Sequence, residues 1–423
     1  MRGRTLLGSL VGALSLVLVT VAPVAAEPPP PPPGAADVDK GKQFREGGSS
    51  YPRAVKLRHS GPLHNGKILV STTTYQNEAG FPVFYESNDD GRSFRQISEI
   101  RDPAGENRQG MCCSTLYELP RQVGDMPAGT LLWAGTAGIG LDAEERQSSI
   151  RLWRSDDHGE TWSYLSDIAN PPQGPGVWEP EFTVSAQGDL VAFYSDDMDP
   201  NHDQKMVQTR SQDGVNWTEP QDTFKDDRFG VRPGMAGVRQ LPDGTYLMTF
   251  EACNYDDQRL CAVYIKTSPD GWNWGDPRDF GTEIKTDTGK YPVHTPTLSW
   301  MPGPGQGKLV LAYQILADES GAPVEGNGRT LLVNDDPTNL ESGWREIPSP
   351  VQIKHNRGSD CRNFSPTVAP IDGGASVLHL TTDYIDYVNG PCELFYGTGP
   401  VDGEPGAEQL LRPQPLDPGR FDA

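Results

Sequence analysis

The stretch Ser87-Asn-Asp-Asp-Gly91-Arg-Ser-Phe94 decides the fold, because nearly the same phrase recurs three more times in the chain. The other copies are residues 155–162, 211–217 and 268–274, and each has Ser-x-Asp, a glycine, two spacers and an aromatic residue. The pattern is typical of a tight hairpin turn, in which the Asp accepts backbone N–H bonds and the Gly takes a positive φ. Four copies roughly 56 to 68 residues apart indicate an array of similar units.

The repeated turn resembles the Asp-box of sialidases and related hydrolases, where it joins the third and fourth strands of a propeller blade. Such a turn is structural and lies on the outer rim of its blade. The resemblance therefore predicts the fold and leaves the chemistry open.

A strand, a glycine turn and a second strand can be read six times along the chain. The first strands are expected near residues 51–55, 113–119, 178–184, 232–241, 292–300 and 363–371, and the second near 67–71, 130–133, 189–194, 245–250, 308–313 and 375–379. These runs are rich in β-branched and aromatic residues and show no helical period. We expect an all-β, sialidase-like six-bladed β-propeller over residues 51–411.

The N-terminus predicts export. Two arginines precede an apolar run that ends in small residues, so residues 1–26 read as a secretory signal peptide. Residues 27–50 contain six consecutive prolines and are expected to form a disordered tether, and residues 412–423 a short tail. We expect a secreted, extracellular monomer. The formal net charge of -22 argues against nucleic acid and membrane surfaces as partners.

Six cysteines in an exported chain favour disulfides. Cys253 and Cys261 flank a polar turn, and Cys361 and Cys392 bracket one blade, so these are the two expected pairs. The adjacent Cys112 and Cys113 leave several alternatives: a vicinal disulfide, one or two free thiols, or a different pairing of the six cysteines. A vicinal disulfide would offer a flat surface against which a sugar ring can stack.

In a propeller the starts of the first strands and the ends of the second strands meet at one mouth of the central channel. This rule brings together arginines, carboxylates and aromatic residues, which suits a polar, hydroxyl-rich or carboxylated ligand. The candidate substrate-binding residues are Arg53, Trp178, Asp197, Arg232, His294, Arg362 and Phe364. We expect Arg53 and Arg232 to lie beside the mouth glutamates.

Paired carboxylates are what glycoside hydrolysis requires. Glu179 and Glu251 stand at mouth-facing positions of adjacent blades and form the candidate catalytic pair. Their carboxyl groups should be about 5 to 5.5 Å apart in a retaining enzyme, or about 6.5 to 9.5 Å apart in an inverting one. Glu181 is a weaker rival to Glu179, because residues two apart point to the same side of a strand. An arginine beside Glu179 would keep it ionised and leave the proton on Glu251.

A series of short segments is more specific. Residues 177–180 (Val-Trp-Glu-Pro), 193–196, 202–205, 232–235 (Arg-Pro-Gly-Met) and 250–251 occur in an order that resembles the exo-acting α-L-arabinanases of glycoside hydrolase family 93. Those six-bladed propellers release arabinobiose from linear 1,5-arabinan with retention of configuration. The resemblance implies Glu179 as nucleophile and Glu251 as general acid/base. It departs at Phe364, where a propeller glycosidase is expected to carry a tyrosine.

Two other functions stay open. An exo-sialidase would use Arg53, Arg232 and Arg362 to clamp a sugar carboxylate, although Phe364 cannot be a nucleophile. A non-catalytic carbohydrate-binding propeller would need no close carboxylate pair. The sequence has no dinucleotide, phosphate-loop or zinc motif, so no cofactor is expected, and a structural calcium ion in the channel stays open.

Overall fold

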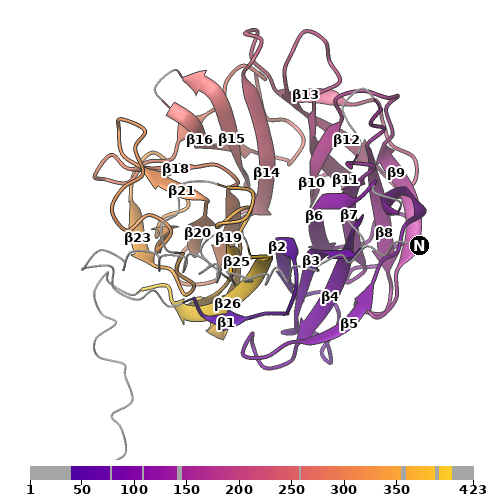
Figure 1. The fold of residues 1–423 in the computed structure, drawn as a ribbon, viewed down its shortest axis with the longest axis horizontal. Helices are drawn as coiled ribbons and strands as arrows, with labels where there is room; N and C mark the ends of the chain where they lie inside the picture. The colour runs from indigo at the N-terminus through magenta and orange to yellow at the C-terminus, as the bar shows by residue number, and fades with distance from the viewer. Residues whose placement is uncertain are drawn as a thin grey trace, which may run out of the picture. The chain divides into compact units, whose positions relative to one another are not determined.

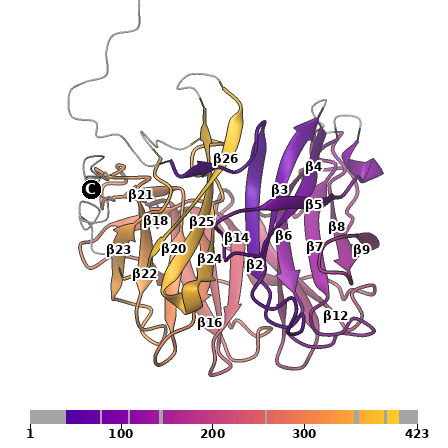
Figure 2. The same ribbon diagram turned by 90° about the horizontal axis from the view of Figure 1, so that it is seen from below.

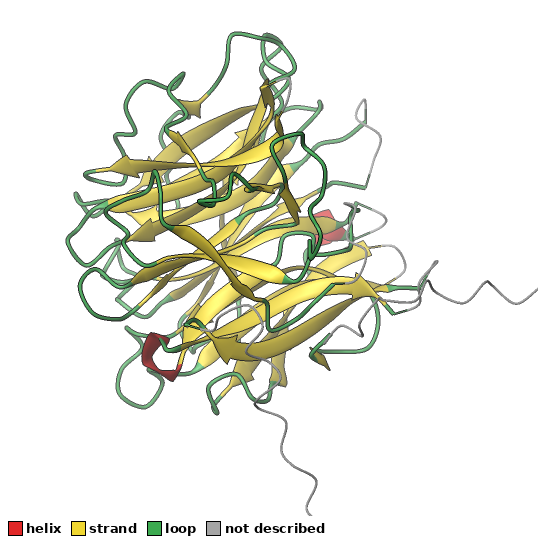
Figure 3. Ribbon diagram, turned by 90° about the vertical axis from the view of Figure 1, so that its left-hand side faces the viewer, coloured by secondary structure: helices red, strands yellow, loops and turns green. Residues whose placement is uncertain are grey.

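The computed structural model describes residues 40–76, 79–106, 109–140, 145–256, 259–353, 359–385 and 390–402. Its regular structure is β-strand, apart from two single-turn 3-10 helices at Pro103–Gly105 and Asp372–Gly374 (Figure 3). None of the helices in the described ranges has the length and apolar character needed to cross a membrane. The predicted signal peptide and C-terminal tail lie outside the described residues.

Six antiparallel sheets follow one another in chain order around a central axis (Figure 1). The first three sheets are formed by β2 (Ser49–Lys56), β3 (Ile68–Gln76), β4 (Ala79–Ser87) and β5 (Arg95–Glu99); by β6 (Met111–Glu118), β7 (Leu131–Ala137), β8 (Ser149–Ser155) and β9 (Ser163–Ala169); and by β10 (Val177–Val184), β11 (Leu190–Asp196), β12 (Lys205–Ser211) and β13 (Gln221–Phe224). The other three are formed by β14 (Arg232–Gln240), β15 (Tyr246–Asp256), β16 (Arg259–Ser268), β17 (Thr282–Glu283), β18 (Tyr291–Val293) and β21 (Ile315–Ala317); by β19 (Thr297–Met301), β20 (Lys308–Ala312), β22 (Thr330–Asn334) and β23 (Trp344–Pro348); and by β24 (Thr367–Ile371), β25 (Ser376–Tyr384), β26 (Cys392–Pro400) and β1 (Lys42–Gln43). The predicted six-bladed, all-β propeller is confirmed.

The fifth unit differs from its prediction. The strand expected over residues 292–300 is split, so that β18 joins the fourth sheet while β19 begins the fifth. His294 and Thr295, with φ of 67° and 46°, stand at the break. The split carries His294 to the edge of the fourth sheet, where its N–H donates to the carbonyl of Cys261 at 2.9 Å.

The last sheet is completed by the first strand of the described chain. β1 pairs with β26, with Lys42 opposite Tyr396 and Gln43 opposite Phe395. Figure 2 shows β24, β25 and β26 beside β2, so the first and last blades are neighbours. The expectation that residues 27–50 are a tether and that the fold starts at Tyr51 is therefore wrong for residues 42–50. A two-residue strand is too short to leave a pattern in the sequence.

The blades are joined by apolar packing. Six large clusters of buried side chains occur in the described chain, and each is shared by two sheets that are neighbours around the ring. In the cluster between the third and fourth sheets, the rings of Phe224 and Phe250 stack at 4.1 Å. No blade therefore buries its faces alone, which is the physical basis of the repeat.

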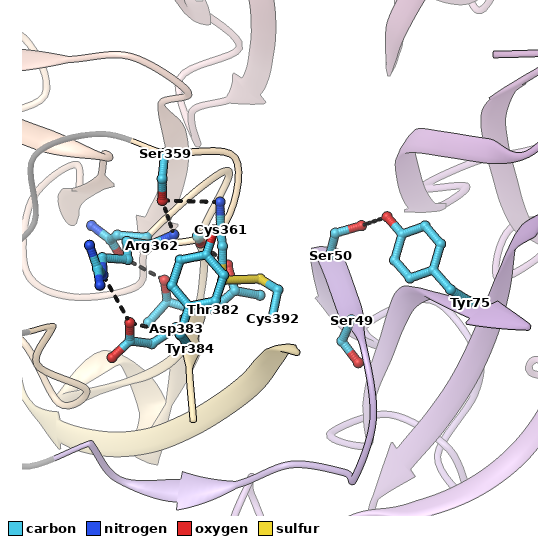
Figure 4. Close-up of a disulfide and its surroundings, with 12 residues drawn as sticks. Ser49, Ser50, Tyr75, Ser359, Cys361, Arg362, Thr382, Asp383, Tyr384 and Cys392 are labelled. Atoms are coloured by element: carbon cyan, nitrogen blue, oxygen red, sulfur yellow. Dashed lines mark hydrogen bonds and ion pairs between the residues drawn. A yellow bond between two sulfur atoms is a disulfide. The ribbon is translucent and has the colours of Figure 1, made fainter. Parts of the chain in front are cut away.

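Both expected disulfides are present, and the open question on the adjacent cysteines is resolved in favour of a vicinal bond. Cys253 and Cys261 lie directly opposite each other on β15 and β16. Cys361 and Cys392 join the segment before β24 to the start of β26 (Figure 4).

The repeated turn is held by its aspartate. In the first copy, the Oδ1 atom of Asp89 accepts hydrogen bonds from the Ser87 hydroxyl at 2.8 Å and from the Ser93 N–H at 2.9 Å. The Ser93 hydroxyl donates to Oδ2. The side-chain and backbone bonds from Ser93 lower the pKa of Asp89 to about 2. The charged carboxylate therefore stabilises the turn at neutral pH.

We predict that Asp89→Ala lowers the free energy of unfolding at pH 7 by about 1 to 2 kcal/mol, because it removes several hydrogen bonds to a charged acceptor. Since the folded pKa lies below the unfolded value, this stabilisation is present above about pH 4 and is lost as the pH falls through about 2. When thermal unfolding is measured between pH 7 and pH 3, the difference in melting temperature between the variant and the wild type should decrease as the pH falls. Asp125→Ala, which removes an exposed ion-pair partner of Arg154, is the control and should have a small effect at all pH values. An equal loss in both variants would contradict the prediction.

Candidate active site

The innermost strands bend at one common level. In β2, β6, β10 and β14 a β-bulge interrupts the pairing with the next strand. In the fifth and sixth sheets, an irregular segment at the same level precedes the innermost strands β19 and β24. Two residues before regular pairing resumes, each chain segment has a positive φ: Tyr51 (49°), Cys113 (58°), Glu179 (61°), Met235 (59°), Thr295 (46°) and Ser365 (50°). Non-glycine residues are uncommon in this region and cluster at functional sites.

These equivalent residues meet near the propeller axis. The Tyr51 hydroxyl of the first sheet lies 3.9 Å from the sulfur of Met235 in the fourth, which is the opposite side of the ring. The Ser365 N–H donates to the Thr295 hydroxyl at 3.0 Å. The six positions therefore form a narrow ring, which we call the bulge ring, across the channel.

Glu179 belongs to the bulge ring. Its Oε2 atom accepts hydrogen bonds from the Ser195 hydroxyl at 3.0 Å and from the Met235 N–H at 3.3 Å. Within the described residues, no hydrogen bond ends on its Oε1 atom. One carboxylate oxygen is thus fixed and the other is left for a ligand.

Glu251 lies on β15, directly opposite Gly234 of β14. Its Oε2 atom accepts the Thr295 N–H at 2.5 Å, and its Oε1 atom lies 3.6 Å from Nε2 of His294. Glu251 is buried. The second candidate carboxylate is therefore also positioned by a backbone N–H of the bulge ring.

Gly234 and Met235 lie between the two glutamates. Gly234 stands opposite Glu251, and the next residue, Met235, donates its N–H to Glu179. A Cβ atom at Gly234 would lie 2.9 Å from the Ser195 hydroxyl and 3.3 Å from Oε2 of Glu179. It would also overlap Nε2 of Gln204, so only glycine leaves room for the polar groups that surround Glu179 to approach this strand.

Burial and proximity raise the pKa values of both carboxyl groups. Burial is the main cause for Glu179, and the negative charge of Glu251 adds to it, so that the pKa of Glu179 rises to about 7. Burial also raises the pKa of Glu251, against which the charge of His294 and the Thr295 N–H act. The two glutamates therefore interact as like charges and do not both ionise freely at neutral pH.

Arg53 lines the same cavity as Glu179, and the charge of Arg232 acts on Glu251, but the direct contacts of both arginines go elsewhere. Arg53 donates to the Ser365 hydroxyl at 2.9 Å and to the carbonyl of Pro52 at 2.8 Å. Arg232 forms ion pairs with Asp197 and Asp203, both at 3.2 Å. The hydrogen bonds and ion pairs of these two arginines in the described chain thus do not go to Glu179, whose pKa is raised rather than lowered. The predicted arginine that holds Glu179 ionised is wrong.

Arg362 lies in the segment before β24, and its ion pair is with a residue of β25. Its Nε atom is 3.6 Å from Oδ1 of Asp383, and its guanidinium group lies 5.2 Å from the Tyr384 ring centroid (Figure 4). Lys40 forms a second ion pair with Asp383, at 2.7 Å. The carboxylate that Arg362 faces is therefore already shared within the protein.

Trp178, Asp197 and Arg232 form one connected group beside Glu179. The indole N–H of Trp178 donates to Oδ2 of Asp197 at 3.1 Å, and Arg232 pairs with the same atom. Arg232 also donates to Gln204, whose amide in turn donates to the carbonyl of Pro233 at 2.9 Å. This group orients polar atoms next to the candidate catalytic pair, as expected for binding sugar hydroxyls.

Glu181, the rival to Glu179, has a structural role. It accepts hydrogen bonds from the Thr115 hydroxyl at 2.9 Å and pairs with Arg239 at 2.8 Å. The bulge between Trp178 and Glu181 breaks the two-residue alternation that would have placed both glutamates on one side. Glu181, Arg53 and Arg239 line a cavity of about 300 Å³ that runs along the inner strands.

An apolar patch adjoins the pair. Cys112, Cys113, Tyr51 and Met235 form one buried cluster, against which Phe364 packs. Phe364 lies edge-on between Tyr51 and His294, with ring centroids 5.6 and 5.5 Å away. Tyr51 was missed by the search along strand ends, although it supplies a hydroxyl near the glutamates whose charges help raise its pKa.

We predict that Glu179→Gln stabilises the protein at pH 8 more than at pH 5. The folded pKa of about 7 lies above that of an unfolded glutamate, so the wild type loses stability as the pH rises through 7, and glutamine avoids that loss. Thermal unfolding at the two pH values measures the effect. Glu181→Gln breaks the pair with Arg239 and should lower the melting temperature at both. A Glu179→Gln variant that is less stable than the wild type at pH 8 would contradict the interpretation.

Comparison with known proteins supports the fold. No protein-family model matches the chain, and no curated protein sequence does. Among solved structures, an α-L-arabinanase from Penicillium chrysogenum complexed with arabinobiose is 23% identical, with 86% of this chain and 99% of that chain covered and a TM-score of 0.68. The GH93 α-L-arabinofuranosidase of Fusarium graminearum with arabinobiose is 22% identical, with 86% and 96% covered and a TM-score of 0.65. The NanB sialidase from Streptococcus pneumoniae is 11% identical, with 86% and 69% covered and a TM-score of 0.52. The chain shares its propeller fold with these glycoside hydrolases.

Proposed function

We propose that the protein is a secreted, exo-acting glycoside hydrolase that cleaves α-1,5-linked arabinan, or a related furanoside polysaccharide, with retention of configuration. The observation that carries the proposal is the pair of carboxyl groups on either side of Gly234 and Met235, each held by a backbone N–H of the bulge ring. The fold shared with arabinan-active propellers supports the choice of substrate.

Glu179 is the nucleophile in this proposal. Hydrogen bonds to its Oε2 atom orient the carboxylate and leave Oε1 to attack the anomeric carbon. The attack forms a covalent glycosyl-enzyme while the bond to the leaving oxygen breaks. A separation of about 5 to 5.5 Å between the two carboxyl groups is the geometry that this step requires.

Glu251 is the general acid/base. It protonates the leaving oxygen in the first step and takes a proton from water in the second. Burial raises the pKa of Glu251, which favours the protonated form that a general acid needs. Because the pKa of Glu179 is raised as well, the two carboxyl groups compete for a proton in the free enzyme. The mechanism requires that this proton be on Glu251 when Glu179 attacks.

The arginines argue against the sialidase alternative. A carboxylate clamp needs three arginines free to converge on one anion, whereas Arg232 pairs with Asp197 and Arg362 faces Asp383. The carboxylate pair in turn argues against a non-catalytic binding propeller, because burying two like charges together costs stability, and groups with pKa values perturbed in this way cluster at catalytic sites.

The direct test is incubation of the purified chain with linear 1,5-arabinan and, separately, with a sialyl-oligosaccharide, followed by product identification. Release of arabinobiose alone from the start of the reaction supports an exo-acting arabinanase. Free sialic acid would favour the sialidase, and binding of arabinan without products would favour the binding propeller.

We predict that Glu179→Gln and Glu251→Gln each reduce turnover of arabinan by at least about 10³-fold, because each removes a group needed for a different proton or bond transfer. Azide should restore hydrolysis of an aryl glycoside with a good leaving group in both variants, with opposite anomeric configuration of the glycosyl azide. NMR of the azide products separates the two roles. Glu99→Gln, on the outer strand β5, is the matched control and should keep full activity. Inversion in the wild type, or turnover unchanged in either variant, would contradict the mechanism.

A further inference from the structure

Four side chains that can ligate a metal ion converge beside the acid/base. One ligand atom from each of Glu251, Cys253, Cys261 and His294 lies within 4.8 Å of the other three. Two of the four come from β15, one from β16, and one from the break that follows β18. The set combines two sulfurs, one imidazole nitrogen and one carboxylate oxygen, which is a zinc-type set.

His294 is oriented as a metal ligand is. Its Nδ1 atom lies 2.7 Å from Oε1 of Gln314, and the Gln314 amide nitrogen donates to the carbonyl of Ser359 at 2.6 Å. Because the amide nitrogen is fixed in this way, the amide oxygen accepts the proton of Nδ1. In the neutral imidazole the lone pair is then on Nε2, the atom that faces Glu251. A partner on the far ring nitrogen is the arrangement that fixes metal-binding histidines.

The Cys253–Cys261 disulfide determines whether all four side chains can bind a metal ion. While Cys253 and Cys261 are bonded to each other, neither sulfur is a thiolate, and the glutamate and histidine remain as two ligands. The two cysteines are directly opposite in the β15–β16 ladder, which is continuous from Tyr246 opposite Ser268. We expect this ladder of hydrogen bonds to keep the two thiols beside Glu251 after reduction.

We propose that the Cys253–Cys261 disulfide is a redox lock on a latent zinc site, and that its reduction lets Zn²⁺ bind the four side chains and withdraw Glu251 from the reaction. A phosphine reductant supplies two electrons and becomes a phosphine oxide by taking the oxygen of one water molecule, while the S–S bond breaks and the two hydrogens of that water complete the thiols. A dithiol does the same by forming its own disulfide and giving up its two hydrogens. Zn²⁺ then displaces both protons as the thiolates bind. Ligand atoms in a tetrahedral zinc site are roughly 3.3 to 3.8 Å apart. The two sulfurs must therefore move apart once their bond is broken, while the other ligand atoms, all within 4.8 Å, approach by about 1 Å at most.

Such a site inhibits rather than catalyses. With four protein ligands the zinc ion has no open position for water, as in structural sites. Glu251 bound to the ion can neither donate nor accept a proton. The oxidised protein keeps this carboxylate free of metal.

The test uses the full chain, oxidised or reduced with tris(2-carboxyethyl)phosphine, titrated with CoCl₂ and then with ZnCl₂. The reduced protein should show a thiolate-to-cobalt absorption band at one ion per chain, displaced by one equivalent of Zn²⁺, and the oxidised protein should show none. This readout does not depend on hydrolysis. The effect on activity rests on the proposed function: Zn²⁺ should inhibit only the reduced enzyme, and a chelator should restore it.

Matched variants assign the site. Cys253→Ala with Cys261→Ala should abolish the cobalt band, and His294→Ala should weaken Zn²⁺ binding by more than about tenfold. Cys361→Ala with Cys392→Ala should bind as the wild type does. The proposal is overturned if the reduced wild type lacks the band, if the first double variant keeps it, or if near-UV circular dichroism shows that reduction alone unfolds the chain. Binding without inhibition would overturn the withdrawal of Glu251 only.

Discussion

The site depends on one local constraint, the bulge that begins at Gly234 in β14. Gly234 has no side chain, so Glu179 can approach from the neighbouring blade, and the strand turns there so that the Met235 N–H points to that carboxylate. The same residue is paired with Glu251 across the β14–β15 ladder. Two carboxyl groups from different blades are thus brought together by one peptide segment, without a flexible loop.

The ring of blades makes this placement rigid. Each apolar cluster is shared by neighbouring sheets, so a shift of one blade would disturb two clusters. This packing holds the two buried carboxyl groups close together, and the positive charges of His294 and Arg232 offset part of the cost, although Arg232 pairs directly with Asp197. The raised pKa values of Glu179 and Glu251 show that the charged form of each carboxyl group is disfavoured at this site.

Much of this was predictable from the sequence, for reasons that lie in particular residues. The Ser-x-Asp turns predict the blades because their hydrogen bonds are local, and the strand-end rule selects Glu179, Glu251 and His294. The rule missed Tyr51 because a bulge with positive φ changes which side chains face the axis. The arginine partners could not be predicted, since their choice of aspartate depends on contacts between distant segments. Strand β1 has only two residues and no periodicity to detect.

The pairing of β1 with β26 couples the beginning of the described chain to its end. A chain that is synthesised from its N-terminus presents β1 long before β26 exists. The sixth blade must therefore wait for the last strand, and the ring closes only when nearly the whole chain has emerged. Contacts so distant in sequence slow folding. Until closure, β1 and the open edge of the sixth sheet remain unpaired, which makes the final step of folding the one most exposed to wrong association.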